Sequence, residues 1–144
     1  MKDKDLETKL RLLSIQLNNW RKLHDLITYG LDKAKPIISS EQERQFTEIR
    51  SSLVQETEFV FRQLNLVSEL SGKVMNVLQR ASSIRGVRDL SNDEVRRMET
   101  DWNTVFTKLG VMQGQLKARR KDLAGRTVIG YHVARLLGRL TPAC

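Results

Sequence analysis

The strongest structural signal in the chain lies in residues 40–84, which read SEQERQFTEIRSSLVQETEFVFRQLNLVSELSGKVMNVLQRASSI. One position in every seven is apolar throughout this stretch, namely Phe46, Leu53, Val60, Val67, Val74 and Ala81. A seven-residue repeat of this length is typical of helices that pack along one another in a left-handed supercoil. We therefore predict a long helix over about 40–84. The most favourable place for a bend or break in so long a helix is Gly72, because glycine weakens a helix. Alternatively, the end of the helix overhangs its partners.

Similar repeats flank this stretch on both sides. The N-terminal seam is Leu6, Leu10, Leu13, Leu17, Trp20, His24, Ile27, Leu31 and Ala34. The C-terminal seam is Val95, Met98, Trp102, Val105, Leu109, Met112, Leu116 and Leu123. Spacings of three and four predict helices over about 4–34 and 91–124. The two-residue alternation of a strand does not occur in the sequence.

The residues between the repeats indicate turns. Pro36 separates the first two segments, since proline lacks the N–H that a helix interior needs. Ser40 with Glu43, and Ser91 with Glu94, match the capping box at a helix start. Short connections make neighbouring helices antiparallel, so the first and third helices would run parallel. We predict an all-α fold, an antiparallel left-handed three-helix coiled-coil bundle over 1–124, with residues 125–144 forming a short amphipathic helix or tail.

The same seams predict the structural core. Its expected members are Leu13, Leu17, Trp20, Ile27, Leu53, Val60, Val67, Val74, Val95, Trp102, Leu109 and Leu116. A large aromatic residue on a heptad seam is explained by packing, so we expect Trp20 and Trp102 to fill the core between the first and third helices. His24 interrupts its seam, and we expect its ring to pack while its nitrogens reach the edge of the bundle.

The charge of the chain is unevenly distributed. The 144 residues contain 25 Lys and Arg against 17 Asp and Glu, a formal charge of +8. Residues 117–144 supply +6 of this, whereas residues 1–116 are close to neutral. The basic side chains of this end are Lys117, Arg119, Arg120, Lys121, Arg126, Arg135 and Arg139. They form either a solvated face near a helix C-terminus or a site for an acidic protein, a phosphate or an anionic lipid.

At helical spacing, residues 126–140 place apolar side chains on one side and basic side chains on the other, as a short amphipathic helix does. Such a segment could lie on an anionic membrane, dock on a partner, fold back on the bundle or begin a further repeat. Membrane contact is expected through this tail only, because no apolar run approaches the ~18 residues of a membrane span.

The sequence offers little support for catalysis or metal binding. One Cys and two His leave no plausible metal site, and no nucleophile, phosphate-binding or zinc-protease motif occurs. We therefore expect no enzyme activity, no catalytic residues and no cofactor. The near-neutral body and the placement of the aromatic residues on the seams argue against nucleic-acid binding.

The chain resembles the spectrin repeat over about residues 4–124. The resemblance rests on the three heptad patterns and on two tryptophans within them, Trp20 in LNNWRKLHDL and Trp102 in RRMETDWNTVFTKL. The second helix is longer than is usual in that family, and His24 departs from its seam. The resemblance implies a single monomeric repeat that spaces or links components of the cytoskeleton or nuclear envelope, closer to dystrophin-like and nesprin-like linkers than to erythroid spectrin. It implies protein partners such as actin or other spectrin-like repeats, and a cytoplasmic, cytoskeletal or nuclear-envelope location. The alternative function is peripheral binding of an anionic membrane or acidic partner through the basic C-terminal end.

Overall fold

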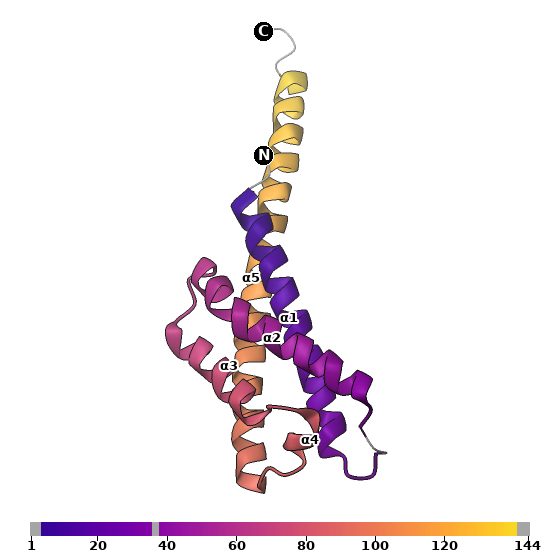
Figure 1. Cartoon of the computed structure of the whole chain (residues 1–144). Coiled ribbons are helices and arrows are strands. Elements are labelled where there is room, and N and C mark those ends of the chain that lie inside the picture. The colour runs from indigo at the N-terminus through magenta and orange to yellow at the C-terminus, as the bar shows by residue number, and fades with distance from the viewer. Residues whose placement is uncertain (1–3, 36–37, 141–144) are drawn as a thin grey trace.

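All regular elements in the described part of the chain are helices. The computed structural model describes the backbone of residues 4–35 and 38–140, and the side chains of this part as far as Gly125. The helices are α1 (Lys4–Leu31), α2 (Ser40–Gln63), α3 (Ser68–Arg80), the single turn α4 (Ile84–Val87) and α5 (Asn92–Leu140) (Figure 1). The predicted all-α class is confirmed.

The segment predicted as one helix over 40–84 is divided by a turn at residues 64–67. Asn65 adopts a φ of 56°, and its N–H donates to the carbonyl of Arg62 at 3.1 Å. The N–H of Leu66 donates to the carbonyl of Phe61 at 2.9 Å, which completes a Schellman motif at the end of α2. Gly72 lies inside α3 with open space around it. The predicted long helix is therefore broken at residues 64–67, and the placement of a bend or break at Gly72 was wrong.

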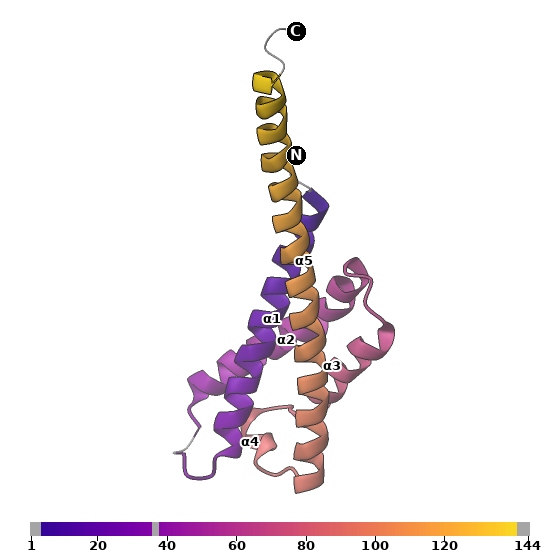
Figure 2. The ribbon, with the colours of Figure 1, turned by 180° about the vertical axis from the view of Figure 1, so that it is seen from behind.

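This turn reverses the chain once more than we predicted, so α1 and α5 run antiparallel. Residue numbers fall along α5 as they rise along α1 in three contacts between the helices: Glu7–Arg120 at 3.7 Å, Ser14–Gln113 at 3.3 Å and His24–Glu99 at 2.9 Å. The expected parallel arrangement of the first and third helices was wrong. Helices α1, α2, α3 and α5 alternate in direction, with α2 on α1, α3 on α5 and α2 beside α3 (Figures 1 and 2).

One apolar core joins these helices. The predicted core residues that are buried in it are Leu13, Leu17, Trp20, Ile27, Leu53, Val60, Val74, Trp102 and Leu109. Val67 is 68% exposed because it lies in the turn before α3. Val95 and Leu116 are half-buried. Placing Val67 in the core was wrong, and full burial of the other two was an overestimate.

The single-turn helix α4 closes the end of the bundle where α1 finishes. The Glu43 carboxylate accepts the backbone N–H of Ile84 at 2.7 Å and of Arg85 at 3.3 Å. Gly30 lies directly against Ile84, because a Cβ on this glycine would approach the Ile84 carbonyl oxygen to 2.8 Å. Glycine therefore permits the close contact between α1 and α4.

The start of α2 differs from the predicted capping box. Ser39 is the N-cap, and its hydroxyl accepts the N–H of Gln42 at 3.1 Å. The Gln42 side chain accepts the Ser39 N–H in return at 2.9 Å. The predicted Ser40–Glu43 box was wrong by one residue, which frees Glu43 to hold α4. The predicted cap of the last helix is present, since the Ser91 hydroxyl accepts the N–H of Glu94 at 3.1 Å.

Helix α5 is far longer than its neighbours. It has 49 residues against 28 in α1, or about 73 Å against about 42 Å at the rise of an α-helix. The Glu7–Arg120 pair places the start of α1 beside the region of residue 123. Roughly the last 17 residues of α5 therefore extend beyond α1, as Figure 1 shows. The predicted helix end at 124 was wrong, and most of the predicted tail continues α5.

Candidate functional site

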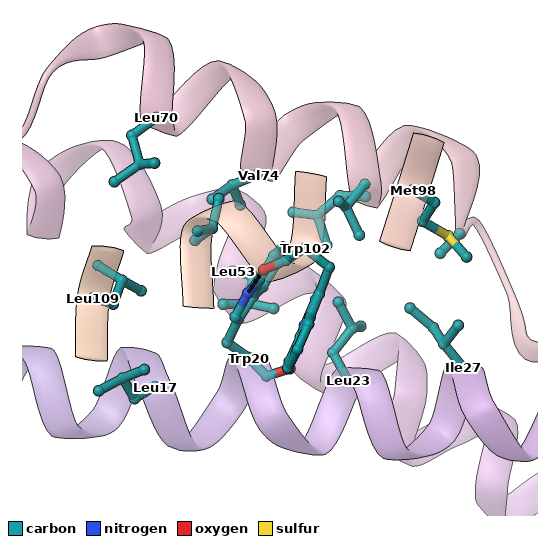
Figure 3. Close-up of a cluster of buried hydrophobic side chains, with 14 of the residues drawn as sticks. Leu17, Trp20, Leu23, Ile27, Leu53, Leu70, Val74, Met98, Trp102 and Leu109 are labelled. Carbon is teal, nitrogen blue, oxygen red and sulfur yellow. Dashed lines mark hydrogen bonds between the residues drawn. The ribbon is translucent and has the colours of Figure 1, made fainter. Parts of the chain in front are cut away.

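Two tryptophans fasten α1 to α5 at the centre of the bundle. The indole N–H of Trp20 donates to the carbonyl of Trp102 at 3.2 Å, and the indole N–H of Trp102 donates to the carbonyl of Trp20 at 3.0 Å (Figure 3). The rings stack with centroids 6.0 Å apart, and both side chains are buried. Each buried indole N–H thereby has a partner on the opposite helix. This reciprocal pair fixes the register of the two helices.

The stack continues toward the surface. The His24 ring lies 3.9 Å from the Trp102 ring, and its Nε2 is 2.9 Å from a carboxylate oxygen of Glu99. The Phe106 ring also stacks with the Trp102 ring, at a centroid distance of 4.9 Å, and the guanidinium of Arg21 lies 5.3 Å from the centre of the Phe106 ring. The His24 ring packs while its nitrogen reaches the bundle edge, as expected. The aromatic faces are occupied by one another, so this cluster serves packing.

A buried polar contact between α1 and α2 was missed by the sequence reasoning. Gln16 and Thr57 are buried, and the Gln16 amide donates to the Thr57 hydroxyl at 2.9 Å. That hydroxyl donates to the carbonyl of Leu53 at 2.5 Å. A glutamine and a threonine between apolar residues look solvent-exposed in a heptad pattern, so no sequence signal distinguished them.

The basic residues predicted to bind a partner begin on the part of α5 that lies beside the first turns of α1. Lys117, Arg119, Arg120 and Lys121 are exposed, and Arg120 pairs with Glu7 at 3.7 Å. Helical geometry brings Lys117 and Lys121 together one turn apart and places Arg119 on the opposite side. The four side chains therefore do not form one cluster.

The other predicted contacts of this end lie further along. Helix α5 runs through Arg126, Arg135 and Arg139, but their side chains lie outside the described residues. The described basic segment, Lys117–Lys121, thus leads into the projecting part of α5 (Figure 2). Within it, Lys117 and Lys121 are exposed on one side of the helix.

A second charged cluster occupies the first turns of α2. Arg44 donates to Glu41 and, at 2.6 Å, to Glu48. The hydrogen bond from Arg44 is the main cause that lowers the pKa of Glu41, and both carboxylates raise the pKa of Arg44. All three side chains are exposed, so water screens this cluster and its contribution to stability is small.

A shallow surface depression of about 510 Å³ lies between α1 and α2. It is lined by Lys22, Asp25, Leu26, Gln45, Glu48 and Ile49. These side chains are of mixed charge and do not converge on a common point as a catalytic site requires. Within the described residues, no group of His, Cys, Asp and Glu side chains could hold a metal ion.

Comparison with models of known families, with curated proteins and with solved structures finds no match. Among the described helices, none has a stretch both long enough and apolar enough to cross a bilayer. The geometry of the molecule itself therefore supplies the argument for function.

Proposed function

We propose that the protein is a structural interaction module, in which a helical bundle supports a projecting basic helix that contacts an acidic protein surface. The observation that carries the proposal is the length of α5, which begins in the bundle core and continues well beyond the start of α1. The tryptophan pair anchors the buried part of this helix. A load applied to the projecting part is thus passed to the core through a continuous backbone.

The charge along α5 supports an acidic partner. Lys117 and Lys121 share one side of the helix and are exposed, and the sequence beyond them adds three arginines against one carboxylate, that of Asp122. Complementary charge accelerates association and selects partners. The proposal includes no catalysis, no cofactor and no nucleic-acid partner.

The proposal keeps the spacing and linking role that the resemblance to the spectrin repeat implies, but not the three-helix arrangement of that family. The heptads of α1 and α5 and the paired tryptophans support the resemblance. The antiparallel order of these helices and the divided segment 40–80 weigh against the three-helix, left-handed arrangement. The cytoplasmic, cytoskeletal or nuclear-envelope location and the monomeric state rest on the resemblance alone.

A disulfide tests the helix order directly. The amide nitrogen of Gln113 lies 3.3 Å from the hydroxyl oxygen of Ser14 in the antiparallel arrangement. Parallel first and third helices in register at their starts would separate these positions by about 16 Å. A Ser14→Cys/Gln113→Cys variant on a Cys144→Ser background should therefore oxidise readily within the chain. Failure to form this bond would support the parallel three-helix order instead.

Cosedimentation tests the binding role, with actin filaments as the acidic protein probe. A Lys117→Glu/Lys121→Glu variant should lose most of its binding, and the loss should be reproduced by raising the salt concentration. The matched control is Lys22→Glu/Lys33→Glu, which makes the same charge change at exposed positions on the first helix and the turn after it. Equal loss in both variants would indicate attraction by net charge alone and reject the site on α5.

The second candidate is peripheral binding to an anionic membrane through the same end. The projection of α5 away from the bundle favours it, since a helix free of neighbours can lie along a surface. Vesicles of phosphatidylcholine with and without phosphatidylserine test it in the same assay. Binding to the anionic vesicles that is abolished by deleting residues 125–144, with no binding to actin, would favour the membrane over a protein partner.

A further inference from the structure

The turn between α2 and α3 preserves the seven-residue register of the sequence. Val60 in α2 and Val74 in α3 are 4% and 0% exposed, whereas Val67, midway between them, is 68% exposed. In a continuous helix all three would share one apolar seam. The segment therefore carries the pattern of one long helix although it folds as two.

Residues 64–67 are also compatible with a helix. They read Leu-Asn-Leu-Val and contain neither glycine nor proline. Asn65 is the non-glycine residue with a positive φ in the described backbone, and Val67 begins α3 without a side-chain hydrogen bond to cap it. The left-handed conformation disfavours residues with a Cβ, although asparagine tolerates it better than most. The turn thus depends on Asn65.

We propose that a second copy of this chain is a binding partner, through exchange of helices about this turn. In the dimer, residues 64–67 become helical and residues 40–80 form one straight helix in each copy. Helices α1 and α2 of one copy then pack on α3 and α5 of the other. Val67 returns to the apolar seam, where the two straightened helices meet.

The exchange preserves the packing that holds the monomer together. The interfaces of α1 with α2 and of α3 with α5 stay within each copy, whereas those of α1 with α4 and α5, and of α2 with α3 and α4, are re-formed between copies. Only the turn changes. Straightening replaces the Schellman hydrogen bonds with helical ones, relieves Asn65 and covers Val67. The loss of freedom on association opposes it, so the dimer depends on protein concentration. This interaction is independent of the basic segment of α5.

Variants at Asn65 test the exchange by sedimentation velocity after refolding over a range of concentrations. Asn65→Ala disfavours the left-handed turn and favours the helix, so the dimerisation constant should rise on the order of tenfold. Asn65→Gly has the opposite preferences and should lower it by a similar factor. Gly72→Ala is the control, because this position is helical in both forms. It should leave the constant unchanged.

The Ser14→Cys/Gln113→Cys pair on the Cys144→Ser background shows how the copies are joined. In an exchanged dimer these positions face one another between chains, so oxidation should yield a covalent dimer on a denaturing gel, whereas isolated monomer should yield only the internal disulfide. A dimer containing only internal disulfides would overturn the proposal, and so would the absence of any dimer in both the wild type and Asn65→Ala. If Asn65→Ala fails to fold, the dimerisation constants of the wild type and Asn65→Gly are compared instead, and the constant of Asn65→Gly should be the lower one.

Discussion

Replacing either tryptophan of the central pair with phenylalanine should destabilise the bundle by about 2–3 kcal/mol. Trp20→Phe removes the N–H that donates to Trp102, and Trp102→Phe removes the reciprocal donor. Each lost hydrogen bond contributes about 0.5–1.5 kcal/mol. The smaller ring also leaves space in a core that excludes water almost completely at both positions, with 0% and 7% exposure, which adds about 1 kcal/mol or more.

The double variant is the sharper test, because the two rings stack on one another at 6.0 Å. Side chains in direct contact show coupling of about 0.5–3 kcal/mol in a double-mutant cycle. We expect the combined loss to fall short of the sum of the single losses by about 1 kcal/mol, since the second substitution disrupts a contact already weakened by the first. Urea unfolding followed by circular dichroism at the helical band gives the three free energies.

A distant pair provides the control for this cycle. Leu6 is buried on α1 about 21 Å along the helix from Trp20, so Leu6→Ala combined with Trp20→Phe should be additive within about 0.5 kcal/mol. Additivity in the tryptophan cycle itself would refute the reasoning. It would mean that the two indoles do not stabilise one another through the stacking contact between their rings.

Three further outcomes follow from individual contacts. Gly30→Ala should destabilise by about 2 kcal/mol in thermal unfolding, because the new methyl group collides with the backbone of Ile84; an unchanged midpoint would contradict that contact. Thr57→Val should cost about 1–3 kcal/mol by leaving the buried Gln16 amide without its acceptor, whereas Thr57→Ser should retain most of the stability. The lowered pKa of Glu41 stabilises the fold at pH values above its ordinary 4.5, and this contribution is lost as the pH falls through the lowered value. The stability difference between wild type and Glu41→Gln should therefore shrink on acidification; a difference that grows would give the opposite sign.

Sequence periodicity identified the helical class and most of the buried positions. Helix starts at residues 4 and 40, and within one residue of 91, agree with the structure. Leu13, Leu53 and Leu109 are buried as the seams predict. These properties are local, because a spacing of three and four residues marks one face of a helix wherever that helix is placed.

The candidate site was predictable only in part. The basic composition of the C-terminal end is evident from the sequence, but its position on a projecting extension of α5 is not. The sequence also did not predict the Gln16–Thr57 hydrogen bond or the hydrogen bond from the N–H of Ile84 to Glu43, since each joins residues 41 positions apart. Such pairings depend on which helices become neighbours.

The amino-acid order determined that the chain would form amphipathic helices and which of their faces would be apolar. Only the tertiary structure decided that residues 40–80 fold back on themselves at Asn65, and with this the direction of α5 relative to α1. The physical reason is that the turn keeps the seven-residue spacing from Val60 to Val74. A straight helix and a helical hairpin then share one hydrophobic pattern, and packing against α1 and α5 selects between them.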